Sequence, residues 1–89
     1  GKIYQILAMA RPLIAAGTPA NRELLSHGET AFLCPPNDPD ALAEAILRLH
    51  DDSALRRRLA EGGHALFQTE CSEAVITARL RNIVRDMNG

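Results

Sequence analysis

The sequence predicts an α/β fold in which two short parallel strands alternate with helices and further helical segments follow. Uninterrupted apolar runs at residues 13–16 and 31–34 are typical of strands in a parallel sheet that is covered on both faces. Around them, apolar residues recur at helical spacing behind helix-start signals. Two strands alone make a marginal sheet, so we expect an incomplete unit of two strands and about five helical segments, whose missing strands precede residue 1.

Proline and glycine residues mark the expected ends of helices and strands in the N-terminal half of the sequence. A helix over residues 2–10 is expected to end at Arg11, because the following Pro12 disfavours the α conformation there. After the strand at 13–16, Thr18 and Pro19 read as the N-cap and first residue of a short helix that reaches Leu25. Gly28 is the candidate for the left-handed residue that closes this helix.

The C-terminal half is predicted to be helical after the second strand ends at Pro35. Asp38 and Pro39 repeat the start signal, for a helix that runs to about His50. Ser53 is expected to cap a further segment, interrupted near Gly62-Gly63. Ser72 is expected to cap a last helix with an apolar stripe formed by Ile76, Leu80, Ile83, Val84 and Met87.

Composition narrows the classes of function. The 89 residues carry a formal net charge of −1, which argues against a nucleic-acid partner, and no apolar run approaches transmembrane length. Cys34 and Cys71 are far apart and lack a CxxC pattern, so neither a metal framework nor a disulfide is indicated and a cytoplasmic setting fits best. We expect no metal site, because no metal-like spacing joins the three histidines, His27, His50 and His64.

Three stretches in order resemble a known family. Residues 2–15 read KIYQILAMARPLIA, residues 18–33 contain TPANRELL and HGETAFL, and residues 35–46 read PPNDPDALAEAI. These stretches resemble the C-terminal donor-binding domain of the glycosyltransferase group 1 family (family GT4, GT-B fold), whose helix typically reads K-x-x-E-x-L-A-x-G-x-P-V-I-A. The resemblance implies that residues 1–89 are the C-terminal part of a Rossmann-like donor-binding domain, with its N-terminal part missing.

The resemblance also assigns donor-binding residues. In the family, an E-x7-E glutamate pair meets the sugar nucleotide, and its second glutamate bonds the ribose. Gln5 stands at that second position, while the first position falls before Gly1. Because the amide of Gln5 is neutral, we expect its hydrogen bond to the ribose to be weaker than that of a glutamate carboxylate. Lys2 precedes Gln5 and is a candidate to approach a phosphate, with a solvated surface lysine as the equally weighted alternative. Ala10 stands where the family prefers glycine, which costs about 1 kcal/mol if the residue is left-handed.

Thr18 and Glu23 complete the set of predicted donor-binding residues. The resemblance places them in the loop and short helix that face the interdomain cleft. Glu23 has a competing structural explanation, because an acidic residue also stabilises the first turn of a helix by about 0.3–1 kcal/mol. The sequence contains no nucleophile–base pair, so we assign no catalytic residue, no metal ligand and no cofactor within the chain.

The resemblance therefore implies a parent enzyme that transfers a sugar from a nucleoside-diphosphate sugar to an acceptor hydroxyl, and this piece is expected to be inactive alone. A membrane-associated acceptor, with the enzyme peripheral to the membrane, is one option that the resemblance leaves open. A non-catalytic binding module of the same fold and a helical protein-interaction domain stay open as alternatives. Without the upstream residues, we expect self-association through apolar surface on the first helix, on the edge of strand 13–16 and near the C-terminus, namely at Ile3, Ile6, Leu7, Ile83, Val84 and Met87.

Overall fold

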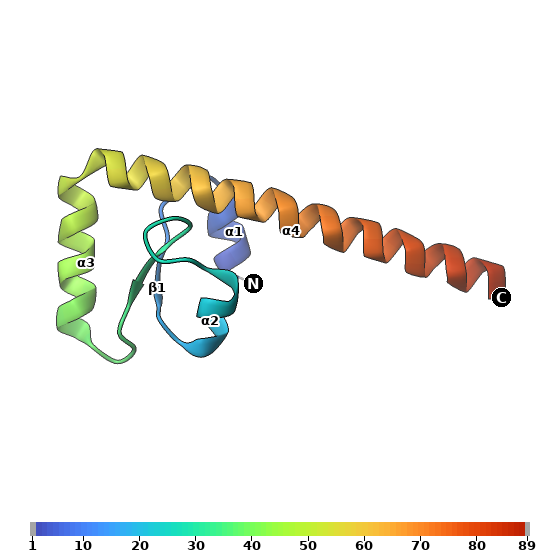
Figure 1. Ribbon diagram of the computed structural model, residues 1–89, viewed down its shortest axis with the longest axis horizontal. Helices are drawn as coiled ribbons and strands as arrows, with labels where there is room; N and C mark the ends of the chain where they lie inside the picture. Colours follow the sequence, from blue (N-terminus) through green and yellow to red (C-terminus); the bar gives the residue numbers. More distant parts are fainter. Residues whose placement is uncertain (1, 89) are drawn as a thin grey trace.

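A computed structural model describes the backbone of residues 2–88 and the side chains of residues 2–71. It confirms the predicted α/β class and the order of the first elements (Figure 1). The elements are α1 (Lys2–Ala8), β1 (Ile14–Ala16), α2 (Pro19–Leu24), β2 (Phe32–Cys34), α3 (Pro39–Asp51) and α4 (Ser53–Asn88). The four helices replace the five helical segments that the sequence predicted, and the difference lies in α4.

The two strands pair in parallel, as predicted. Ile14 lies opposite Phe32, and Ala16 lies opposite Cys34. The backbone N–H of Gly17 extends the pairing by donating to the carbonyl oxygen of Cys34 at 2.7 Å. Helix α2 is the connection between the strands, as a parallel pair requires a crossover rather than a hairpin.

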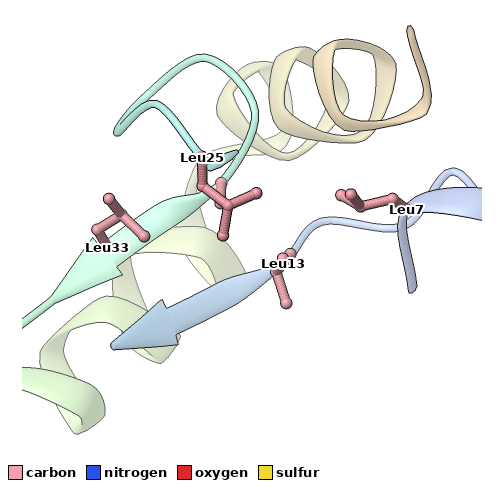
Figure 2. Close-up of a cluster of buried hydrophobic side chains, with 5 residues drawn as sticks. Leu7, Leu13, Leu25 and Leu33 are labelled. Atoms are coloured by element: carbon pink, nitrogen blue, oxygen red, sulfur yellow. The ribbon is translucent and has the colours of Figure 1, made fainter. Parts of the chain in front are cut away.

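The two faces of the two-stranded sheet belong to two different hydrophobic clusters, and α4 contributes to both. Residues 13, 15, 31 and 33 belong to a core shared with α1 and with Leu25, which includes Leu7, Leu13, Leu25 and Leu33 (Figure 2). Residues 14 and 32 instead pack against a second cluster from α3 and α4, made of Leu49, Leu55 and Leu59. Because strand side chains alternate between faces, both faces must be apolar, and this explains the uninterrupted apolar runs.

Helix α1 corrects the expectation that Ile3, Ile6 and Leu7 are bare. Leu7 is fully buried, and Ile3 and Ile6 are partly buried against the same cluster. Leu66 and Phe67 of α4 pack against this cluster too, and Figure 1 shows α4 crossing α1, so α4 supplies part of the cover that we expected to be missing. The predicted exposure of Ile83, Val84 and Met87 concerns side chains outside the described residues.

Helix α4 also corrects the predicted break at Gly62-Gly63, because it runs without interruption from Ser53 to Asn88. The glycines permit close packing rather than a bend. A Cβ on Gly62 would lie 2.0 Å from the carbonyl oxygen of Glu29, and a Cβ on Gly63 would lie 2.7 Å from Leu7 Cδ2. Ser72 consequently lies inside α4 and caps nothing.

The N-cap of α4 lies one residue before the predicted cap, Ser53. The carboxylate of Asp52 accepts a hydrogen bond from the Leu55 N–H at 2.9 Å, so Asp52 and not Ser53 is the N-cap. The predicted caps Thr18 and Asp38 are confirmed, because they accept from the N–H groups of Asn21 and Ala41 at 3.2 Å and 3.0 Å. Asp52 also ends α3, which leaves no room for a separate loop residue.

Gly28 is left-handed, with φ of +81°, but it does not close α2 as predicted. Helix α2 ends at Leu24, and its C-cap Leu25 has an extended backbone and a side chain buried in the core. Gly28 lies in the following turn, where its N–H donates to the carbonyl oxygen of Ala31 at 2.9 Å. Arg58 of α4 donates to the carbonyl oxygen of Gly28 at 3.0 Å, which holds this turn against α4.

Helix α1 ends in a Schellman motif that contains Ala10 at its left-handed position. The N–H of Arg11 donates to the carbonyl oxygen of Ile6 at 3.4 Å, and that of Ala10 donates to Leu7 at 3.1 Å. Ala10 has φ of +54°, the conformation in which glycine is favoured. The alanine at the family's glycine position is therefore a strained residue that the remaining fold tolerates.

Replacing Ala10 with glycine is expected to stabilise the chain by about 0.5–1 kcal/mol. Glycine removes the cost of about 1–2 kcal/mol that a left-handed backbone imposes on alanine. The greater conformational freedom of glycine in the unfolded chain offsets part of this stabilisation. Urea unfolding followed by circular dichroism measures the difference. The matched Ala8→Gly variant, inside α1, is expected to lose stability, and a loss in both variants would contradict the strain at Ala10.

Candidate functional site

The carboxyl ends of β1 and β2 form one wall of a groove of about 610 Å³. In parallel α/β sheets, ligands usually bind outside these ends. The groove is predominantly apolar, with one acidic side chain, and its lining residues are Ile14, Ala15, Ala16, Cys34, Pro35, Pro36, Asn37, Asp38, Pro39 and Leu42. A negatively charged diphosphate finds no cationic group among these residues.

The polar side chains of the turn after β1 form hydrogen bonds within the turn itself. Thr18 Oγ1 accepts from the N–H of Asn21, and Asn21 Nδ2 donates to the carbonyl oxygen of Ala16 at 2.9 Å. Arg22 Nε donates to the carbonyl oxygen of Gly17 at 3.0 Å. Thr18 therefore has a structural role as a helix cap, which accounts for its presence without a ligand.

Asn21 and Arg22 were not identified from the sequence, although they fix the strand end next to Thr18. The available signal was their position. The third and fourth residues after an N-cap lie in the first turn of the helix, which folds back toward the carbonyl groups of the preceding strand. A polar side chain there has unpaired carbonyl oxygens within reach, as the Ala16 and Gly17 contacts illustrate.

Lys2 and Gln5 lie on α1 and are exposed. Gln5 is two residues from the buried Leu7, which places it about 200° around the helix and away from the packed side. Glu23 is exposed on α2. Among the described residues, no hydrogen bond or ion pair joins Lys2 or Gln5 to Thr18 or Glu23, so the structure does not bring the four predicted residues into one contacting cluster.

Cys34 is a core residue at the carboxyl end of β2. Its side chain is buried, and burial raises the pKa of the thiol above its usual value, with the nearby Asp38 carboxylate acting in the same direction. A raised pKa lowers the fraction of reactive thiolate near neutral pH. The chemistry of Cys34 is therefore that of a small apolar side chain rather than a nucleophile.

The His27 side chain has a structural role beside β2. Its Nδ1 atom accepts the backbone N–H of Leu33 at 3.0 Å, and its ring meets Phe32 edge-on at 4.8 Å between centroids. This contact requires a neutral imidazole with its proton on Nε2. Within the described part of the chain, no group of three or more His, Cys, Asp or Glu side chains is arranged to hold a metal ion.

Hydropathy gives no membrane-spanning candidate among the helices of the described residues. Helix α4 is long enough in backbone terms, with 36 residues, but its sequence contains many charged side chains. A chain crossing the bilayer as a helix needs about 20 predominantly apolar residues.

Comparison with known proteins gives consistent matches over this fold. The family model described as glycosyl transferases group 1 matches residues 1–52. An exopolysaccharide phosphotransferase of Streptomyces coelicolor is 47% identical over 58 residues, which cover 56% of this chain and 6% of that protein. Alpha-D-kanosaminyltransferase of Streptomyces kanamyceticus is 32% identical over 85 residues, covering 96% of this chain and 22% of that protein.

The structure of sucrose-phosphate synthase from Thermosynechococcus elongatus matches with a TM-score of 0.78 at 28% sequence identity. The match covers 97% of this chain and 22% of the synthase, so it includes nearly all of α1 to α4. The chain thus spans about a fifth of the length of the synthase and of the kanosaminyltransferase.

Proposed function

Because the chain belongs to the family of group 1 glycosyl transferases, we propose that it forms the C-terminal part of the donor-binding domain of a longer enzyme. That enzyme transfers a glycosyl unit from a nucleoside-diphosphate sugar to an acceptor hydroxyl. The observation that carries the proposal is the family match over residues 1–52, because it includes α1 with Lys2 and Gln5. The likeness to sucrose-phosphate synthase over 97% of the chain supports the same fold for this part.

In this proposal the exposed side of α1 faces the donor. Gln5 and Lys2 are exposed and take no part in the core, so both are free for a ligand as far as the described contacts go. The amide of Gln5 bonds a ribose hydroxyl, and the ammonium group of Lys2 approaches the diphosphate as a point charge. Thr18 and Glu23 shape the donor cleft from the connection between β1 and β2. Thr18 does so through the turn before α2, which it caps.

Gln5 provides the test of this arrangement. In the full-length enzyme, Gln5→Glu is expected to tighten nucleoside-diphosphate binding about fivefold, since a carboxylate accepts a ribose hydroxyl bond about 1 kcal/mol better than an amide. Gln5→Ala is expected to weaken it by a similar factor. Calorimetry with UDP and GDP, and with their common sugar conjugates, measures both changes.

Ala8→Glu is the matched control, because Ala8 is exposed one turn further along α1 and receives the same charge. It is expected to leave the affinity unchanged or slightly weaker through repulsion of the diphosphate. If Gln5→Glu and Ala8→Glu change the affinity equally, the ribose contact is wrong and only the net charge matters.

A second candidate is a donor-binding module without transfer activity, and the glutamine at the family's glutamate position favours it. The two candidates differ in turnover. A full-length protein that binds the donor but neither hydrolyses nor transfers the sugar, and that gains turnover with Gln5→Glu, supports the binding module.

The proposal extends to two partners. The acceptor is carried at a membrane surface, which co-sedimentation of the full-length enzyme with lipid vesicles tests. The 89 residues alone pair with a second copy through the open edge of β1, where unpaired backbone groups are a template for another strand. Sedimentation velocity of the purified 89 residues measures this pairing.

A further inference from the structure

We propose that Arg22 binds a phosphoryl group of a ligand that occupies the groove at the carboxyl ends of β1 and β2. The guanidinium group of Arg22 lies beside Gly17, which directly follows the groove-lining strand residue Ala16. The proposal rests on the proposed function, since that function brings a nucleoside diphosphate to this end of the sheet. It adds a cationic residue that the sequence did not identify as a ligand-binding group.

A hydrogen bond at the end of β1 fixes the position of the guanidinium group. Arg22 Nε donates to the carbonyl oxygen of Gly17 at 3.0 Å. Gly17 is itself held by the other strand, because its N–H donates to the carbonyl oxygen of Cys34 at 2.7 Å. An arginine anchored through Nε loses less side-chain freedom when its remaining N–H groups bind a ligand.

The terminal nitrogens of Arg22 have donors left for a ligand. A guanidinium group carries five N–H donors, and the bond to Gly17 uses one of them. Within residues 2–71, Arg22 forms no other hydrogen bond and no ion pair, although the Glu23 carboxylate is next to it in the sequence. Two parallel N–H groups of a guanidinium match two oxygens of a phosphoryl group, and such charge-assisted bonds are about twice as strong as neutral ones.

Gly17 leaves room for the guanidinium group because it has no side chain. Its backbone is not left-handed, so conformation alone does not require glycine at this position. A Cβ on Gly17 would lie 2.6 Å from Arg22 Nη2 and 3.2 Å from Arg22 Cζ. Alanine at position 17 would therefore push the guanidinium group aside. The cost to the fold is small, because the atoms that must move are the end of a flexible, exposed side chain.

Arg22 also supplies the positive charge that the groove lacks. The residues lining the groove include the Asp38 carboxylate and no cationic side chain. Two other arginines that bond backbone carbonyl groups do so elsewhere: Arg56 at the end of α3, and Arg58 at Gly28 in the turn before β2. Among the described arginines, Arg22 is the one whose hydrogen bond lies at the carboxyl end of a strand, where parallel sheets bind their ligands.

Binding of phosphates and nucleosides to the full-length enzyme tests the proposal. The probes are inorganic phosphate, pyrophosphate, UDP, GDP, uridine and guanosine, measured by direct or competition calorimetry. Arg22→Gln is expected to weaken binding of pyrophosphate and of both nucleoside diphosphates about tenfold. It is expected to leave the two nucleosides unchanged, since they carry no phosphoryl group. Arg22→Lys is expected to recover part of the loss, because lysine keeps the charge but not the planar pair of donors.

Arg57→Gln is the matched control, because Arg57 is exposed on α4, lies outside the groove and loses the same charge. It is expected to change each affinity by less than about twofold, since exposed charges at a distance are screened. Losses of similar size in Arg57→Gln and Arg22→Gln would overturn the proposal, because net charge alone would then explain both.

Gly17→Ala tests the geometry. It is expected to weaken pyrophosphate binding about as much as Arg22→Gln, while Tm changes by less than about 2 °C. In the Arg22→Gln background, Gly17→Ala is expected to add no further loss, because the guanidinium group that it displaces is already gone. Additive losses would contradict the proposed position of the guanidinium group.

The pattern across the probes identifies the source of the phosphoryl group. A loss with UDP or GDP that spares the nucleosides assigns Arg22 to the diphosphate of the donor. A loss with pyrophosphate and inorganic phosphate alone also supports phosphoryl binding, but from another ligand. Equal losses with phosphates and nucleosides, unchanged affinity for every phosphate, or an enzyme that binds none of them overturns the proposal. Pyrophosphate contains neither nucleoside nor sugar, so it tests Arg22 even if the Gln5 variants show that the proposed donor contact is wrong.

Discussion

Replacing Gly62 with alanine is expected to destabilise the chain by about 3 kcal/mol or more. The new Cβ would lie 2.0 Å from the carbonyl oxygen of Glu29 and 3.1 Å from its carbonyl carbon, and both are backbone atoms that no rotamer change can move. Alanine inside a helix otherwise gains about 1 kcal/mol over glycine, so helix propensity predicts the opposite sign. The clash prevails because α4 must separate from the 27–31 turn. Urea unfolding followed by circular dichroism measures the loss.

Two other glycines provide the controls. Gly28→Ala meets nothing within 4 Å and is expected to cost about 1 kcal/mol, solely because φ is +81°. Gly63→Ala is expected to be intermediate, because its nearest atom is the flexible end of Leu7, although the carbonyl oxygen of Thr30 lies 3.1 Å away. A Gly62→Ala variant as stable as Gly28→Ala would show that α4 does not contact the turn at Glu29.

The strands and the first three helices were predictable because their signals are local. Apolar runs of four residues, the Thr18-Pro19 and Asp38-Pro39 starts, and Pro12 act through neighbouring residues alone. The structure places each strand and helix boundary within about two residues of those signals. The parallel pairing followed from the rule that strands alternating with helices form parallel sheets.

Helix α4 was not predictable in the same way, because glycine has two uses. Gly62-Gly63 has low helix propensity, and the local reading is a break. The same two residues are what allow a helix to lie directly against a turn and against Leu7, and that contact is between segments more than 30 residues apart. No local sequence pattern predicts a contact between segments so far apart in the sequence. The burial of Leu7 was missed for the same reason, since α4 supplies the cover.

In the candidate site, too, the features that depend on neighbouring residues were predictable and those that depend on distant contacts were not. The sequence identified Thr18 as a helix cap, and the structure confirms that role. The hydrogen bond from the Leu33 N–H to His27 was not predicted, because it depends on the fold of the 27–31 turn. The donor-binding roles of Lys2, Gln5, Thr18 and Glu23 stay predictions, because no contact among the described residues tests them.

The 89 residues alone are expected neither to transfer sugar nor to bind a nucleoside-diphosphate sugar at micromolar concentrations. Lys2 and Gln5 are exposed, so any bond they make to a ligand competes with water and contributes little. The groove near the strand ends is apolar and includes the Asp38 carboxylate, which repels a diphosphate. Transfer also requires an acceptor held in line with the donor, an arrangement worth about 7–11 kcal/mol of the barrier.

Calorimetry with UDP- and GDP-sugars, together with a radiolabelled transfer assay, tests this expectation for the 89 residues and for the full-length enzyme in parallel. The Gln5→Glu variant of the 89 residues is the internal check, because one improved ribose contact adds only about 1 kcal/mol. If binding starts from a millimolar Kd or weaker, that gain still leaves the Kd well above the micromolar range. Micromolar binding or measurable turnover by the 89 residues would mean that α1 and the turn at Thr18 form a complete donor site, and the proposal that the donor site is shared with preceding polypeptide would fail.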